Sequence, residues 1–67
     1  MEFLERWEYD MVILPLRELD APYGGEPRLR RDLNARGAEG WELVSTVLRG
    51  RDYDRELVCV LKRRLVE

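Results

Sequence analysis

Arginine is the residue type in this sequence with the most evident capacity for binding chemistry. Its guanidinium group is permanently charged and can donate two parallel hydrogen bonds to a phosphate or a carboxylate. If several arginines converge in an oligomer, they would form a pocket between subunits for an anionic metabolite or nucleotide. The candidates for such a pocket are Arg28, Arg31, Arg49, Arg51 and Arg64. The alternative is a solvated charged surface, in which Asp32 pairs with Arg28 and Arg36 one helical turn away on either side.

Catalytic chemistry has fewer candidates. The chain has no histidine, so Ser45 and Thr46 lack the base that commonly activates a hydroxyl nucleophile. Cys59 lies between two valines, which predicts a buried structural thiol and not a reactive one. Glu39 and Glu42 have no identifiable catalytic partner. One thiol with scattered carboxylates is a poor set of zinc ligands. We therefore expect no enzymatic activity, no metal site and no cofactor.

Length and composition indicate one small folded domain over residues 1–67. Twelve basic and fourteen acidic residues nearly cancel, which disfavours a phosphate-tracking surface and makes nucleic acid an unexpected partner. The N-terminal residues do not resemble a signal peptide, and no apolar run reaches the roughly 18 residues of a membrane span. With one unpaired cysteine, we expect a cytoplasmic protein without membrane association.

Periodicity predicts four elements in the order β-α-β-β. Apolar residues alternate over 7–14, which predicts a strand. Pro27 suits the first turn of a helix, and Gly37 is placed to end it in the left-handed conformation. Strands are predicted over 41–49 and 55–64, joined by a turn at 50–53, whereas 16–27 reads as a loop. The expected fold is α+β, a three-stranded antiparallel sheet in the order 1-3-2 with one helix on one face.

Side-chain chemistry predicts a register for this sheet. Placing Asp10 opposite Lys62 in the first and third strands matches opposite charges. It also sets Glu8 against Arg64, Val12 against Val60 and Leu14 against Val58. In the second and third strands, Glu42 opposite Lys62 sets Val44 against Val60. A slip of one residue is expected to remove these matches.

This register sorts the sheet into two apolar faces. Leu29 and Leu33 of the helix are expected to cover the face that carries Trp7, Tyr9, Met11, Ile13, Trp41, Leu43, Val47, Leu57, Cys59 and Leu61. The opposite face has an apolar strip with a charged rim, which is typical of a protein interface. Its members, predicted to form an oligomer interface, are Val12, Leu14, Val44, Thr46, Leu48, Val58 and Val60. We therefore expect a homodimer or a higher oligomer. Alternatively, Phe3 and Leu4 or the loop over 16–23 would fold over the strip.

Three segments resemble a known family. They are Trp7-Glu8-Tyr9, the run from Leu33 to Ser45 with the letters LNARGAEGWELVS, and Leu61-Lys62-Arg63. They are similar to motifs of the small bacterial and phage proteins called the domain of unknown function 4177 family. Leu61 replaces an aromatic residue of that pattern, and the loop over 16–27 is unusually rich in Pro and Gly. The resemblance implies a fold and a bacterial or phage origin, and it implies no activity.

Two functional classes follow from these expectations. The first is a non-catalytic homo-oligomer that binds or regulates another protein. The second is an oligomer that binds or sequesters a small anionic ligand in an arginine-lined pocket between subunits.

Overall fold

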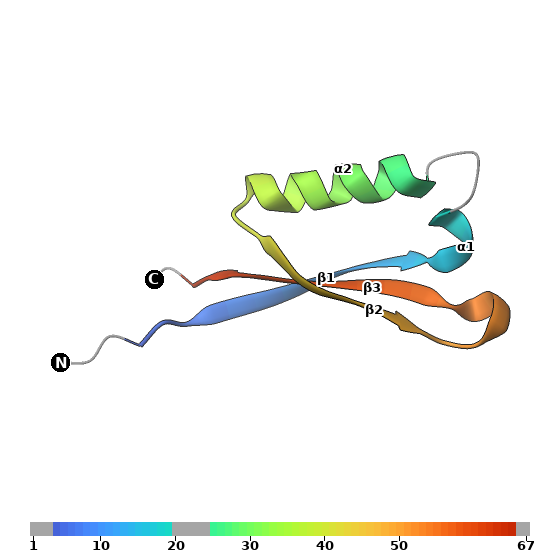
Figure 1. Cartoon of the computed structure of the whole chain (residues 1–67). Coiled ribbons are helices and arrows are strands. Elements are labelled where there is room, and N and C mark those ends of the chain that lie inside the picture. The colour runs from blue at the N-terminus through green and yellow to red at the C-terminus, as the bar shows by residue number, and fades with distance from the viewer. Residues whose placement is uncertain (1–3, 20–24, 66–67) are drawn as a thin grey trace.

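The computed structural model describes residues 4–19 and 25–65, which form a three-stranded sheet with helices on one side (Figure 1). Strand β1 spans Trp7–Pro15, β2 spans Glu42–Arg49 and β3 spans Glu56–Arg64. Both pairings are antiparallel and the strand order is β1-β3-β2. Helix α2 spans Gly25–Ala38. These findings confirm the predicted α+β fold and its strand order.

The segment after β1 differs from the prediction. Residues 16–19, expected in a loop, form the short helix α1, Leu16–Leu19. Helix α2 begins at Gly25, two residues before Pro27. Gly25 is buried, and a Cβ there would lie 2.0 Å from the carbonyl oxygen of Glu18. The close approach of the two helices therefore requires glycine at this position. Phe3 and residues 20–24 were part of the alternative prediction, in which the chain itself covers the apolar strip. They lie outside the described residues.

Gly40, and not Gly37 as predicted, is the left-handed residue that caps the end of helix α2. Gly40 has a φ of +92°, whereas Gly37 lies inside the helix. The N–H of Gly40 donates to the carbonyl of Gly37 at 3.0 Å, and the N–H of Trp41 donates to that of Arg36 at 3.0 Å. These two bonds are those of a Schellman motif, in which a left-handed residue follows the last helical turn. The second glycine of the Gly-Ala-Glu-Gly run therefore ends the helix.

The register of β1 against β3 is shifted by one residue from the prediction. Tyr9, not Asp10, lies opposite Lys62, and Val12 lies opposite Cys59. In the other pair, Glu42 lies opposite Lys62 as predicted. An irregularity between Leu43 and Ser45 then removes Val44 from the ladder, so Ser45 lies opposite Val60. The predicted pairing of Val44 with Val60 is therefore wrong.

Two registers of β1 both set its apolar residues against those of β3, which explains the error. Residues 11–14 and 57–61 are continuous apolar runs, and 62–64 are all basic. A slip of one residue therefore still sets the apolar runs against each other and Glu8 against a basic residue, although it moves Asp10 from Lys62 to Leu61. The observed register places Val12 beneath the helix, where it packs with Cys59 and Leu61. Leu29, Leu33, Trp41 and Leu57 pack against this core.

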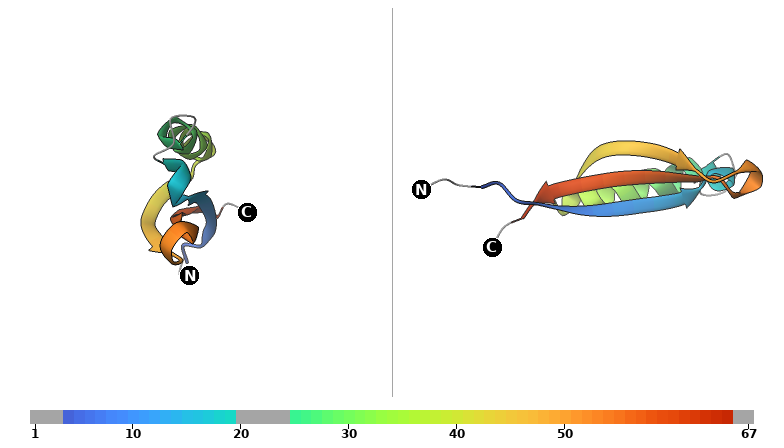
Figure 2. Two further views of the ribbon diagram at one scale, coloured as in Figure 1. Left: turned by 90° about the vertical axis from the view of Figure 1, so that its right-hand side faces the viewer. Right: turned by 90° about the horizontal axis from the view of Figure 1, so that it is seen from below.

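The molecule is flat, and it exposes more surface than a compact chain of its size. Its Cα radius of gyration is 14.6 Å, against about 11 Å for a compact chain of this length. Its accessible surface is 5667 Å², whereas a folded monomer of this mass exposes about 4,500 Å². The end-on view in Figure 2 shows α2 on one side of the sheet and no described helix on the other. Within 4–19 and 25–65, no helix is long and apolar enough to cross a bilayer.

Candidate functional site

The side of the sheet without a helix is the main candidate for a functional surface, and we call it the open face. Residues directly opposite each other in an antiparallel pair project to the same side. The register therefore puts alternate residues of the three strands together on this face. Its apolar members are Trp7, Tyr9, Met11, Ile13, Val47, Val58 and Val60.

These side chains form rows that run across the sheet. One row is Ile13, Val58 and Val47, and the next is Met11, Val60 and Ser45. Val58 is buried because its row neighbours flank it on the central strand. The outer members remain exposed, from 39% for Trp7 to 63% for Tyr9. A contiguous exposed apolar surface of this kind is typical of interaction sites.

Charged side chains bound the open face at both ends. Arg49 and Glu56 lie opposite each other at one end and are joined by an ion pair of 3.0 Å. At the other end Glu42 lies opposite Lys62, whose Nζ is 4.2 Å from the centroid of the Trp7 ring. An apolar centre with a mixed-charge rim has the anatomy of a protein interface.

The predicted interface set is divided between the two faces by the register. Val12 and Leu14 are buried on the helix side, at 8% and 2% exposure. Thr46 and Leu48 lie on that same side, opposite Cys59 and Leu57, and both are exposed. Val58 and Val60 lie on the open face, and Val44 is the unpaired residue of the irregularity in β2.

The sequence prediction placed five residues of the open face beneath the helix, yet each is exposed: Trp7, Tyr9, Met11, Ile13 and Val47. The first four lie in β1, whose register was wrong by one residue, and Val47 follows the irregularity in β2. The alternation in β1 was visible in the sequence. The alternation does not indicate on which side of the sheet the odd positions lie.

The candidate anion-binding arginines do not gather at one place. Arg28 and Arg31 lie on α2, Arg49 and Arg51 lie at the turn between β2 and β3, and Arg64 lies at the opposite end of β3. Four of them are near carboxylates of the chain: Arg28 with Glu18 (2.9 Å), Arg31 with Asp32 (3.8 Å), Arg49 with Glu56 (3.0 Å) and Arg64 with Glu5 (2.8 Å). The expected helical pairs of Asp32 with Arg28 and Arg36 are replaced by these contacts and by Arg36 with Asp10. An arginine-lined pocket therefore remains a prediction without geometric support in a single copy.

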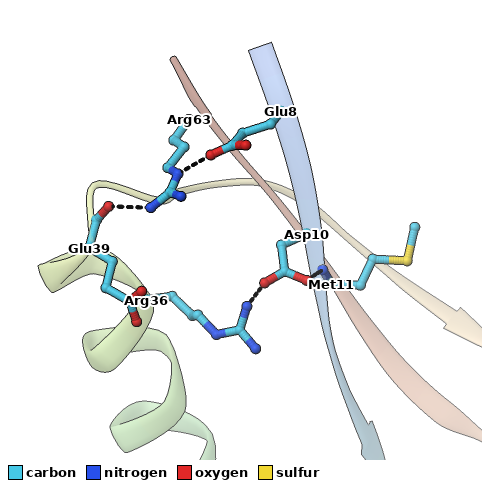
Figure 3. A network of polar contacts seen from close by, with 6 residues as sticks. All are labelled: Glu8, Asp10, Met11, Arg36, Glu39 and Arg63. Atoms are coloured by element: carbon cyan, nitrogen blue, oxygen red, sulfur yellow. Dashed lines mark hydrogen bonds and ion pairs between the residues drawn. The ribbon is translucent and has the colours of Figure 1, made fainter. Parts of the chain in front are cut away.

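A polar network joins the end of α2 to the sheet (Figure 3). Arg36 forms an ion pair with Asp10 of β1, and Arg63 of β3 forms one with Glu8. Arg63 also donates to the backbone carbonyl of Glu39 at 2.9 Å and lies 4.4 Å from the centroid of the Trp41 ring. The acidic and basic groups of this network neutralise each other. Its residues therefore hold the helix on the sheet, and they account for the charged position in the Trp-Glu-Tyr segment.

Cys59 is the most buried side chain of the core, at 1% exposure. Desolvation by burial raises the pKa of the Cys59 thiol above its ordinary value. The thiolate is the nucleophilic form, so a raised pKa disfavours reactivity. The predicted burial of the Cys59 thiol is therefore confirmed.

Comparison with known proteins identifies a family. The family model described as "Domain of unknown function (DUF4177)" matches residues 7–64, which span all three strands and α2. No curated protein and no solved structure matches the chain.

Proposed function

The chain belongs to the domain of unknown function family DUF4177, and we propose that it serves as a non-catalytic, homo-oligomeric interaction module. In this proposal a second copy covers the open face, and the assembly binds or regulates another protein. The observation that carries the proposal is the apolar surface that the helices leave uncovered.

The energetic argument starts from burial. Among the described residues, the buried hydrophobic side chains are Val12, Leu14, Val58, Cys59 and Leu61. Small domains are marginally stable even when they bury the usual fraction of their surface. Disulfides, metals or association commonly supply additional stability. A single cysteine excludes a disulfide within the chain. Self-association is the supplement that the surface of this molecule favours.

The open face has the size and the charge pattern for a second copy. Its outer side chains, which include Trp7, Tyr9 and Met11, are 39–63% exposed, and aromatic side chains contribute much of the area in interfaces, which must bury at least about 1,000 Å² to be specific. Each end of the face carries both an acid and a base. A two-fold axis brings the same surface against itself, and a mixed rim permits attraction in that arrangement.

Light scattering on a sizing column tests this proposal. We expect the wild-type chain, of 8.0 kDa, to elute at a multiple of that mass at about 100 μM. Met11→Lys places a charge in the middle of the open face and should raise the dissociation constant at least about tenfold, or about 1.4 kcal/mol. Tyr53→Lys is the matched control, because Tyr53 is 89% exposed in the turn outside the face.

Two results would contradict the proposal. A wild-type chain that stays at 8.0 kDa throughout this range would exclude self-association. An oligomer whose dissociation constant is unchanged by Met11→Lys would exclude the open face as its interface.

A further inference from the structure

We propose that the free edge of β2 pairs with β2 of a second copy, giving a continuous six-stranded antiparallel sheet with its two-fold axis at Thr46. This inference rests on the proposed self-association and names a second surface that carries it. The open face then becomes one apolar surface twice as wide.

Strand β2 is an edge of the sheet, and every residue in it is exposed. Its large apolar side chains lie on both sides of the sheet: Leu43 and Leu48 on the helix side, Val47 on the open face. Each of the three is about half exposed. In the right-hand view of Figure 2, α2 lies behind β1 and β3 while β2 bows away from it. An unprotected, apolar edge strand readily pairs with another strand.

The irregularity in β2 gives the strand an internal symmetry. Because Val44 is outside the ladder, the paired positions in order are 42, 43, 45, 46, 47, 48 and 49. Thr46 is the middle of these seven. We place Val44 outside the new ladder as it is outside the ladder with β3, so that side chains keep their sides of the sheet. A two-fold axis at Thr46 then sets Glu42 against Arg49 of the second copy and Leu43 against Leu48. Each of these pairs shares a side of the sheet, as antiparallel neighbours must.

Charges alternate along the row at each end of the combined sheet. Within one copy Glu42 lies opposite Lys62, and Arg49 lies opposite Glu56. Pairing of β2 with its symmetry mate joins these into one row, Lys62, Glu42, Arg49 and Glu56, with the last two from the second copy. Its signs are plus, minus, plus, minus. Every charge in the row then has a neighbour of opposite sign, which favours this register over its alternatives.

Apolar and hydroxyl side chains match on the helix side. Leu61 and Leu43 of one copy continue into Leu48 and Leu57 of the second, which forms an unbroken row of leucines. At the axis itself Thr46 meets its own symmetry mate, a pair that antiparallel sheets favour.

The other edge of the sheet is less suited to pairing. On β1 the N–H of Met11 donates at 2.8 Å to the carboxylate of Asp10, the residue before it (Figure 3). Pro15 at the end of the strand has no N–H to donate. Local side-chain bonding and proline both discourage strand addition.

Disulfide cross-linking of Thr46→Cys tests the pairing. Directly opposite residues have Cα atoms about 4.5–5.5 Å apart, within the range that a disulfide spans. Because Cys59 lies opposite Thr46 within the same chain, the cysteine variants are made in a Cys59→Ala background, in which a disulfide within one chain cannot form. In this background we expect Thr46→Cys to form a covalent dimer under mild oxidation. Arg49→Cys is the matched control on the same exposed edge, because its symmetry mate would be about 20 Å away, six paired positions along the strand. Cross-linking should be at least about tenfold slower for this control.

Mixed chains test the register. Glu42→Cys and Arg49→Cys should each fail to cross-link alone and should cross-link when the two variants are mixed, because the two positions are opposite each other in the proposed pair. Mass spectrometry of chains with different isotope labels identifies the mixed dimer.

The outcomes separate this inference from the proposed function. An oligomeric wild-type chain whose Thr46→Cys variant cross-links no faster than Arg49→Cys overturns the β2 pairing and leaves association through the open face. Fast cross-linking of Thr46→Cys that persists in a Met11→Lys background supports pairing through β2 independently of the open face. A mixture of Glu42→Cys and Arg49→Cys that does not cross-link overturns the register centred on Thr46.

Discussion

Gly40 has a conformational role that its neighbour Gly37 does not share. It adopts a φ of +92°, and its N–H and that of Trp41 close the end of α2. Trp41 then turns back onto the core, where it packs against buried residues and beneath Arg63. The glycine therefore sets the angle at which the chain leaves the helix and enters β2. The sequence contained two glycines at suitable spacing, and only the backbone conformation distinguishes them.

Alanine substitutions at the two glycines should have opposite effects. Gly40→Ala forces a side chain into the left-handed region and should lower the free energy of unfolding by about 1–2 kcal/mol. Gly37→Ala is the control: it lies inside the helix with nothing within 4 Å of an added Cβ, and it should raise stability by about 0.5–1 kcal/mol. Urea unfolding followed by circular dichroism measures both. Equal destabilisation by the two substitutions would contradict the assignment of the cap.

At the scale of elements, α2 is held to the sheet by few contacts. Leu29 and Leu33 supply its apolar contacts, and the ion pair of Arg36 with Asp10 joins its last turn to β1. Both side chains of that pair are about one-third exposed, so solvent screens their attraction substantially. The pair nevertheless discriminates between registers, because a shift of β1 by one residue would move Asp10 to the other side of the sheet.

A double-mutant cycle on Asp10→Asn and Arg36→Gln should give a coupling energy of about 0.5–1 kcal/mol. The coupling should decrease as salt is raised, because screening weakens partly exposed ion pairs. The matched control is Glu26 with Arg30, a pair within α2 that is more exposed, for which about 0.3–0.5 kcal/mol is expected. Chemical denaturation of the four chains in each cycle supplies the values. No coupling between Asp10 and Arg36 would argue against the observed register of β1.

At the scale of the whole molecule, the sheet is larger than its helices can cover. The excess accessible surface over a typical monomer is roughly 1,200 Å², and it lies on a molecule whose principal extents are 53 × 25 × 13 Å. Both the open face and the edge of β2 contribute apolar side chains to this excess. Folding and association are therefore expected to be coupled.

Coupled folding and association make stability depend on protein concentration. For a dimer, each tenfold rise in concentration should add about 1.4 kcal/mol per mole of dimer to the apparent free energy of unfolding. Thermal melts at three concentrations between about 5 and 500 μM should therefore show a rising midpoint. Met11→Lys should reduce this dependence, while Tyr53→Lys should leave it unchanged. A midpoint independent of concentration for the wild-type chain would indicate that a single copy is stable alone.

The sequence by itself determined the number and order of the strands, the position of α2, the fold class and the buried state of Cys59. These features depend on local periodicity, on proline and glycine, and on the short link between β2 and β3, all of which are readable along the chain. The resemblance to the family also lay in the sequence, in the motifs around Trp7 and Trp41.

The tertiary structure alone decided which side of the sheet each apolar residue occupies. Both registers of β1 keep its apolar run against that of β3 and Glu8 against a basic residue, since both runs are continuous and residues 62–64 are all basic. Pair chemistry alone favoured the wrong one, because it set Asp10 against Lys62 and not against Leu61. The helix selects between them, because Val12 must lie beneath Leu29 and Leu33 while Asp10 meets Arg36. Contacts between distant elements therefore decided the register, which pairwise matching of two strands had predicted wrongly.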